Sequence, residues 1–533
     1  MKKRILAMAL ALPLIAGTFT SCGADMDASY SSTAGDNRYI VQENADSSYA
    51  EDFADAESEY YDSSNEEYRE FMESGFKNPE TEPLSTFSAD VDTASYSNAR
   101  RFINDGMKVP EDAVRIEEFI NYFDYNYADP QEDEKFGQYV EITDCAWNAD
   151  SKLMMIGLQG DRMKKSETPP SNLVFLIDSS GSMNSYDKLP LVQQAFSMLA
   201  ENLTEYDRIS IVTYAGTSET VLEGAKGSDK DTIVDALYSL KANGSTNGEG
   251  GINTAYEIAE KYFIDDGNNR VVLATDGDLN VGLSSEEELT KLIESKRDKG
   301  IYLSVLGFGT GNYKDARLEA VADHGNGNFS YIDSVDEARR VLVEEMTGTL
   351  YTIAKDMKIQ VEFNPKQVKS YRLIGYDNRI MNAEDFYDNT KDAGEVGAGH
   401  SVTALYEIQL TEDEGKYHGV PLEFAEPTTE ETTDENARKE ICKLSITYKD
   451  IDTNDDIYKN KLFGMELYND EPSDRMCLAS AVTEFAMLLK NSEYKGNSSF
   501  DYVVSNAEKV AESTENDRVT ELVQLAEMAR NMN

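Results

Sequence analysis

Three oxygen-bearing side chains follow a continuous apolar run at alternate positions. The run from Leu173 to Ile177 consists of branched and aromatic residues, which is typical of a strand buried on both faces of a parallel sheet. Asp178, Ser180 and Ser182 come directly after it, so a loop leaving the strand can direct one carboxylate and two hydroxyls at one point. Hard oxygen ligands of this kind favour Mg²⁺, Mn²⁺ or Ca²⁺ over zinc or copper. Taken alone, the pattern also fits an ordinary turn after a strand.

Two later stretches carry similar residues. Thr246 lies in a glycine-rich turn that precedes an amphipathic run from Gly251 to Phe263. Asp276 ends a second apolar run, which starts at Val271 and again favours a buried strand.

The set and the order of these residues resemble the metal-ion-dependent adhesion site of the von Willebrand factor type A domain. In that family, an Asp, two Ser, a Thr and a later Asp surround one divalent cation, and the partner supplies the remaining ligand, usually a carboxylate. The resemblance implies that the ion is held by Asp178, Ser180, Ser182, Thr246 and Asp276. A plain turn does not explain three separated clusters that match at once.

The charge balance limits the class of partner. The chain has 533 residues, enough for about two to four domains, with 100 acidic and 50 basic side chains and a formal net charge of −50. Nucleic acids and anionic lipid surfaces are poor partners for such a surface, because like charges repel.

The first residues predict export. Three basic residues at positions 2–4 precede an apolar run from Ile5 to Ala16 that is too short to span a membrane. The small residues before Cys22 resemble a bacterial lipobox, which implies a lipid on Cys22, with ordinary signal cleavage as the alternative. We therefore predict a lipoprotein signal peptide at residues 1–22 and an exported bacterial lipoprotein of the cell envelope, at the outer membrane or cell surface. Residues 23–82 are rich in Ser, Asp and Glu and predict a disordered acidic linker.

Residues 83–170 form a predicted N-terminal flanking domain. Helical patterns run from Ser95 to Asn104 and from Glu111 to Phe123, and two strands follow. Asp90 and Asp92 are spaced like the carboxylates of phosphatases that form an aspartyl-phosphate. The long buried strand that this chemistry needs does not precede them, so catalysis here is a minor alternative.

Residues 171–356 alternate strands and helices, and the last predicted helix runs from Asp336 to Ile353. This alternation predicts an α/β fold with a doubly wound, mainly parallel sheet. Ligands bind such sheets at the carboxyl ends of the strands, where Asp178 and Asp276 lie.

The rest of the chain changes character twice. Residues 357–460 alternate apolar and polar side chains, which predicts a β-rich C-terminal domain. Residues 461–533 predict a helical tail, with helices from Arg475 to Leu489 and from Arg518 to Met532. Cys145, Cys442 and Cys477 are too far apart to indicate a disulfide framework or a zinc site.

The folded body is similar to a family of bacterial lipoproteins that carry a type A domain between family-specific N- and C-terminal segments. The matching stretches are Pro83 to Phe87, Asn172 to Ser182, Tyr214 to Gly216, Ala274 to Gly282, Leu306 to Tyr313 and Arg372 to Tyr376.

Our leading hypothesis is a lipid-anchored, non-enzymatic envelope protein that binds the Asp or Glu of a protein partner through Mg²⁺, Mn²⁺ or Ca²⁺. One alternative is a metal-dependent hydrolase or phosphatase-like enzyme that uses Asp90 and Asp92 or the metal. Another is a scaffold that the metal rigidifies. The three histidines, at positions 324, 400 and 418, have no metal-ligand spacing and no evident nucleophile beside them.

Overall fold

The structure is a computed structural model. It describes residues 66–532, apart from residues 90–91, 133, 165–167, 244–247, 278–285, 312, 389–390, 392, 412–439 and 452. Among the helices within these ranges, none is both long and apolar enough to cross a membrane. The predicted signal peptide, Cys22 and most of the predicted linker lie outside the described residues.

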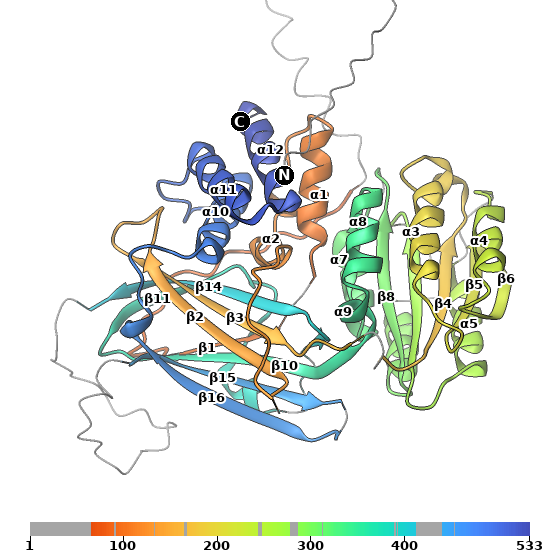
Figure 1. Ribbon diagram of the computed structural model, residues 1–533, viewed down its shortest axis with the longest axis horizontal. Helices are drawn as coiled ribbons and strands as arrows, with labels where there is room; N and C mark the ends of the chain where they lie inside the picture. Colours follow the sequence, from red (N-terminus) through yellow and green to blue (C-terminus); the bar gives the residue numbers. More distant parts are fainter. Residues whose placement is uncertain are drawn as a thin grey trace, which may run out of the picture. The chain divides into compact units, whose positions relative to one another are not determined.

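A six-stranded sheet forms the central unit (Figure 1). Its strands, in spatial order, are β6 (Thr217–Lys226), β5 (Arg208–Ala215), β4 (Ser171–Asp178), β7 (Asn268–Thr275), β8 (Ile301–Phe308) and β9 (Phe329–Ile332). All neighbours pair in parallel except β5 and β6, which are antiparallel. β4 lies in the middle of the sheet and is buried along its whole length, as its unbroken apolar composition predicts.

Helices cover both faces of this sheet. One face packs against α3 (Leu189–Glu201), α4 (Lys230–Ser239) and α8 (Val335–Arg339), and the other against α5 (Gly248–Lys261), α6 (Glu286–Arg297) and α7 (Asp315–His324). The predicted doubly wound fold is therefore confirmed. Neither α7 nor β9 was predicted from the sequence.

The predicted helix from Asp336 to Ile353 is wrong in its extent. α8 passes into a π-helical turn at Arg340–Glu344, then α9 (Met346–Leu350), and a strand begins at Thr352. Leu350 packs in the core of the central unit, whereas Ile353 packs in a different core. The helical spacing of these apolar residues therefore extends by coincidence across the end of the helix.

The central unit is inserted between two flanking segments that share their sheets. One sheet has the order β12 (Ile380–Met381), β1 (Leu84–Ser88), β10 (Thr352–Phe363), β15 (Glu440–Asp450) and β16 (Asp456–Gly464), with β13 (Gly394–Gly397) also paired to β10. The other has the order β11 (Val368–Ile374), β14 (Ser401–Leu410), β3 (Lys152–Gly160) and β2 (Phe136–Asp144). Residues 83–170 and 357–460 are therefore not two separate sheets, because each sheet takes strands from both segments.

Where the chain enters and leaves the central unit, the two ends are adjacent. The hydroxyl oxygens of Ser171, the first residue of β4, and Tyr351, just after α9, lie 3.0 Å apart.

The two flanking sheets pack face to face, and helices cover the outer face of one of them (Figure 1). Met154 and Ile156 of β3 face the other sheet, whereas Leu153 and Met155 face the helices, as the alternation of a strand requires. The helices are α1 (Ala94–Asn104), α2 (Ile116–Asn121), α10 (Asp474–Leu489), α11 (Phe500–Thr514) and α12 (Asp517–Met532). Residues 461–464 belong to β16, and apart from a 3₁₀ turn at Met465–Leu467 the predicted tail becomes helical at Asp474, where α10 begins.

The predicted disordered linker ends earlier than expected. Residues 66–82 contact the folded body: Glu66 pairs with Arg101 at 2.8 Å, and Glu67 and Lys77 form bridges to Lys314 and Tyr371. This segment is held by single anchoring contacts and has no helical or strand periodicity, so its local pattern gave no sign of order.

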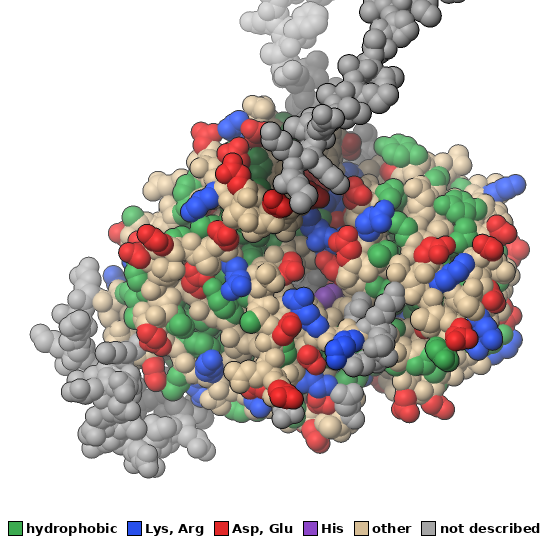
Figure 2. Space-filling view, viewed as in Figure 1, with side chains coloured by type: hydrophobic (Ala, Val, Ile, Leu, Met, Phe, Trp, Pro, Cys, Tyr) green, Lys and Arg blue, Asp and Glu red, His purple; other side chains and the backbone are tan. Residues whose placement is uncertain are grey.

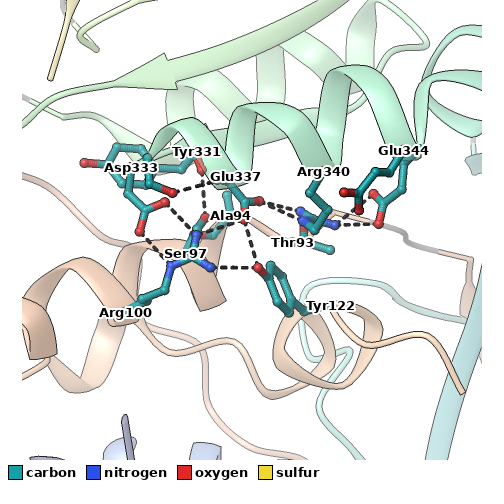
Figure 3. A network of polar contacts seen from close by, with 12 residues as sticks. Thr93, Ala94, Ser97, Arg100, Tyr122, Tyr331, Asp333, Glu337, Arg340 and Glu344 are labelled. Carbon is teal, nitrogen blue, oxygen red and sulfur yellow. Dashed lines mark hydrogen bonds and ion pairs between the residues drawn. The ribbon is translucent and has the colours of Figure 1, made fainter. Parts of the chain in front are cut away.

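A buried ionic network joins the last helix of the central unit to α1 (Figure 3). Arg100 of α1 contacts Asp333 at 2.6 Å and Glu337 at 2.8 Å, and Glu337 also pairs with Arg340 at 2.6 Å. The Tyr122 hydroxyl donates to Glu337 at 2.9 Å. Burial alone would raise the pKa of Glu337, but Arg340 and Arg100 lower it below its ordinary value, so the carboxylate stays charged.

Replacing Arg340 with Met should lower the stability of the whole chain. The change keeps most of the side-chain volume but leaves the buried Glu337 carboxylate without one of its two cations, at a cost of about 3 kcal/mol. Arg339, exposed on the same helix, is the matched control, and Arg339→Met should cost less than about 0.5 kcal/mol. Urea unfolding curves measure both; equal midpoints for the two variants would contradict a structural role for the network.

Candidate metal centre

Two predicted ligands lie at the carboxyl ends of neighbouring strands. Asp178 is the last residue of β4, and Asp276 follows the last residue of β7. The two strands are parallel and in register, with Ile177 opposite Ala274, so both carboxylates reach the same end of the sheet. Both side chains are buried, at 0% and 1% exposure.

The loop after β4 brings the two serines together. Asp178 Oδ1 accepts a hydrogen bond from the backbone N–H of Ser180 at 2.8 Å, and this bond turns the chain back toward the carboxylate. The hydroxyl oxygens of Ser180 and Ser182 lie 2.9 Å apart. Ser180 is buried and Ser182 is exposed, so the pair runs from the sheet to the surface.

Thr246 lies outside the described residues. On its N-terminal side, the N–H of Asn243 donates to the carbonyl of Ser179 at 2.7 Å, and on its C-terminal side α5 begins at Gly248. Four of the five predicted ligands, Asp178, Ser180, Ser182 and Asp276, are therefore among the described residues.

The two carboxylates are only partly satisfied. Among the described residues, Asp178 Oδ2 and Asp276 Oδ1 are buried and have no hydrogen-bond partner within bonding geometry, although the Tyr214 hydroxyl, which also has none, lies close enough to Asp178 to lower its pKa. Burial, and secondly the nearby Asp276, raise the pKa of Asp178 to about 6. Buried carboxylate oxygens without a partner are costly, so a cation bound between Asp178 and Asp276 would stabilise the site.

Tyr214, which sequence reasoning missed, forms one wall of this site. It lies opposite Asp178 in the register of β4 and β5, and burial next to Asp178 raises the pKa of its phenol well above the ordinary value. Gly251 of α5 packs against it so closely that an added Cβ would lie 2.7 Å from the Tyr214 Cβ. The start of α5 can therefore approach the strand ends only with glycine at this position.

A lysine that the sequence analysis did not single out also belongs to the site. Lys188 Nζ lies 2.9 Å from Asp276 Oδ2, and its side chain is 9% exposed. The stem of Lys188 crosses Gly309, where an added Cβ would lie 2.3 Å from the Lys188 Cγ and where φ is +68°. Glycine at position 309 thus makes room for Lys188 to reach Asp276.

The donor set fits a hard divalent cation. Among the described residues, no three His, Cys, Asp or Glu side chains group in a way that could hold a metal. Two carboxylates beside two hydroxyls suit Mg²⁺, Mn²⁺ or Ca²⁺.

The alternative catalytic pair is not supported by the surroundings of Asp92. Its Oδ1 accepts a hydrogen bond from the N–H of Phe329 at 2.9 Å, and its Oδ2 lies 3.4 Å from Arg379, so this carboxylate ties β9 to the flanking segment. Asp90 lies outside the described residues.

The chain resembles described families over most of its length. It matches "von Willebrand factor" over residues 62–155, "von Willebrand factor type A domain" over residues 172–345 and "Uncharacterized protein YfbK, C-terminal" over residues 348–532.

Individual proteins show the same pattern. "Uncharacterized protein YfbK" of Escherichia coli (strain K12) is 39% identical over 469 residues, which is 87% of this chain and 80% of that protein. Human inter-alpha-trypsin inhibitor heavy chain H3 is 29% identical over 193 residues, 34% of this chain and 22% of that protein. A solved structure, "von Willebrand factor type A from Catenulispora acidiphila", covers 75% of this chain and 91% of its own, with 14% identity and a TM-score of 0.40.

Replacing Asp178 with Asn should stabilise the metal-free protein. Because the folded pKa of Asp178 is raised, its charge costs stability above pH 6, and this cost disappears as the pH falls toward 3.8. We expect a gain of about 3 kcal/mol at pH 7.5, the free-energy equivalent of raising a carboxyl pKa from 3.8 to about 6, and little gain at pH 4. Thermal unfolding in EDTA across this pH range measures it.

Asp235→Asn is the matched control, because Asp235 is exposed on α4 and should change stability little at any pH. A loss of stability in Asp178→Asn at pH 7.5 would contradict the prediction that the charged Asp178 side chain destabilises the metal-free fold.

Proposed function

Since the chain belongs to the YfbK family of bacterial von Willebrand factor type A proteins, we propose that it is a binding protein that holds a protein partner through a divalent cation at Asp178 and Asp276. Type A domains act generally in protein interaction and adhesion. The observation that carries the proposal is the pair of buried carboxylate oxygens without partners at the ends of β4 and β7.

The site's charge supports an anionic partner. Asp178 and Asp276 together bear two negative charges, and Lys188 bears one positive charge. Adding a divalent cation leaves a net charge of about +1, which a partner's Asp or Glu would neutralise. Ser180 and Ser182 would supply hydroxyl ligands, and the exposed Ser182 marks the side from which the partner approaches. The bound ion would offer an open coordination position to the partner's carboxylate.

The proposed location is the cell envelope. The basic residues at positions 2–4, the apolar run after them and the lipobox-like residues before Cys22 support an exported, lipid-anchored protein. A chain of net charge −50 would then be held at a membrane by its lipid and not by attraction to the lipid surface.

Calorimetric titration of Mg²⁺, Mn²⁺ and Ca²⁺ into the full chain tests the site. We expect one ion bound per chain, and loss of that binding in Asp178→Ala but not in Asp235→Ala. Absence of binding in the unaltered protein would remove the basis for a metal-dependent function.

The same variants separate a partner-binding site from a metal-rigidified scaffold. In the binding proposal, immobilised wild-type chain captures envelope proteins in Mg²⁺ but not in EDTA, and Asp178→Ala captures none in either. If Asp178→Ala lowered thermal stability yet kept every metal-dependent partner, the scaffold would be correct instead.

Replacing Lys188 with Met should tighten metal binding. The Lys188 ammonium is paired with one oxygen of Asp276 at 2.9 Å. A bound ion must therefore displace the ammonium or bind a few ångströms from its positive charge, which repels the ion. We expect the affinity for Mg²⁺ to rise by about tenfold in titration calorimetry. Lys241→Met, which removes an exposed cation shortly before the Thr246 turn, is the control and should leave the affinity unchanged. Weaker binding in Lys188→Met would show that the lysine supports the ion instead of competing with it.

A further inference from the structure

A groove of about 360 Å³ lies between the free edges of the two flanking sheets. β2 ends one sheet and β16 ends the other, and the groove is bordered by the first half of β2 and the middle of β16. We call it the edge groove and define it by residues 127–131 and 134–139, Ile446 and Tyr448 of β15, residues 459–461 of β16, and Arg475 of α10. It is separate from the metal centre, which lies on the central sheet.

The inner face of β16 carries two lysines where a buried strand would carry apolar residues. Lys459 pairs with Ile446 and Lys461 with Leu444, and residues directly opposite in an antiparallel pair point to the same face. Ile446 and Leu444 belong to the core between the sheets. The two lysines therefore project toward the space between the sheets, but they are exposed because no strand of the other sheet covers them there.

The floor and the opposite wall of the edge groove combine apolar and amide groups. Phe136 and Tyr448 pack edge to face with ring centroids 5.1 Å apart. Gln138 alternates with Phe136 and Val140, so it faces the space between the sheets, and its buried Oε1 has no hydrogen-bond partner among the described residues. An unused amide oxygen is an acceptor for a ligand N–H.

The edge groove is basic on a strongly acidic protein. Its cations are Lys135, Lys459, Lys461 and Arg475, and its acidic side chains are Asp129 and Glu134. Asp129 is paired with Arg162 and Lys135 with Asp450, so both of these charges are already compensated. Lys459 and Lys461 form no ion pair with any carboxylate that the structure describes. On the face that carries β2 and β16, Figure 2 shows basic side chains interspersed among acidic ones.

We propose that the edge groove binds an extended peptide segment with carboxylates at alternate positions, of the type Glu-x-Glu. Lys459 and Lys461 are two residues apart on one face of a strand, a separation of about 7 Å. An extended peptide presents its own alternate side chains at the same repeat, so two carboxylates can meet the two ammonium groups without bending the chain.

The free strand edges favour a peptide over another anionic polymer. Along Phe136–Tyr139 and along β16, no described strand pairs with the outer edge, so backbone N–H and C=O groups are available. Added strands bind such edges through main-chain hydrogen bonds, and side-chain contacts then set the specificity. A sulfated or phosphorylated glycan would use the lysines but not the strand edges.

Lysines on edge strands also have a protective role, because charges there oppose pairing between molecules. Charge reversal separates the two roles. A glutamate at position 459 or 461 protects the edge equally well but repels an acidic peptide.

Fluorescence anisotropy with synthetic peptides tests the proposal on the purified full chain, in EDTA so that the metal centre cannot bind carboxylates. The probes are a labelled octapeptide of alternating Glu and Thr, an isomer with its four Glu in one block, and an alternating Lys-Thr peptide. We expect the alternating acidic peptide to bind most tightly and to weaken with added salt. Lys459→Glu should reduce its affinity by at least about tenfold.

Lys443→Glu is the matched control, because Lys443 projects from the opposite face of the same sheet and should leave the affinity unchanged. Equal binding of the two Glu isomers, or equal effects of the two variants, would overturn the proposal. Either result would show that the protein attracts negative charge in general and does not recognise carboxylates at alternate positions of an extended peptide. Binding of a sulfated oligosaccharide in place of the acidic peptide would overturn it in favour of a glycan site.

Discussion

A chain with twice as many acidic as basic residues has few cations for its buried carboxylates, and arginines supply them where the flanking segments meet the central unit. Arginine suits this role because its planar guanidinium group can bind two carboxylates at once. Arg100 and Arg340 share Glu337 between α1 and α8, and Arg115 and Arg379 share Glu319 between the flanking segments and α7. Three of these four ion pairs join a flanking segment to the central unit, whereas Arg340 and Glu337 both lie in the central unit.

The candidate metal centre is where this compensation is incomplete. Asp178 and Asp276 lie side by side at the strand ends, and only Lys188 among the described residues pairs with either of them. The ion pairs between segments and the proposed site therefore follow the same electrostatic rule. Between the segments, cations of the chain itself neutralise the carboxylates. At the site, negative charge and oxygen atoms remain for an ion and for a partner.

Local pattern predicted most of the central unit, but not α7, β9 or the end of the helix that starts at Val335. The unbroken apolar composition of β4 and β7 predicted buried parallel strands, and parallel strands bring Asp178 and Asp276 to one end of the sheet without further information. Lys188 could not be predicted in the same way, because its reach to Asp276 depends on the absence of a side chain at Gly309, which is distant in sequence.

The flanking segments were harder to predict for a physical reason. Alternation identifies a strand and its buried face but not its neighbour, so β1 gave no sign that it pairs with β10, some 270 residues later. The ordered residues 66–82 were missed because they depend on contacts such as the pair of Glu66 with Arg101. Such contacts have no periodic signature.

The adjacency of Ser171 and Tyr351 has a consequence for folding. In an unfolded chain, pairing β1 with β10 must close a loop of several hundred residues, which is slow and entropically costly. Once the central unit is folded, the hydroxyl oxygens of Ser171 and Tyr351 lie 3.0 Å apart, so the chain that separates β1 from β10 is shortened to little more than the residues of α1, α2, β2 and β3. The central unit is built from contiguous sequence, whereas the two flanking sheets need strands from both sides of it. A folded central unit therefore lowers the entropic cost of pairing the two flanking segments.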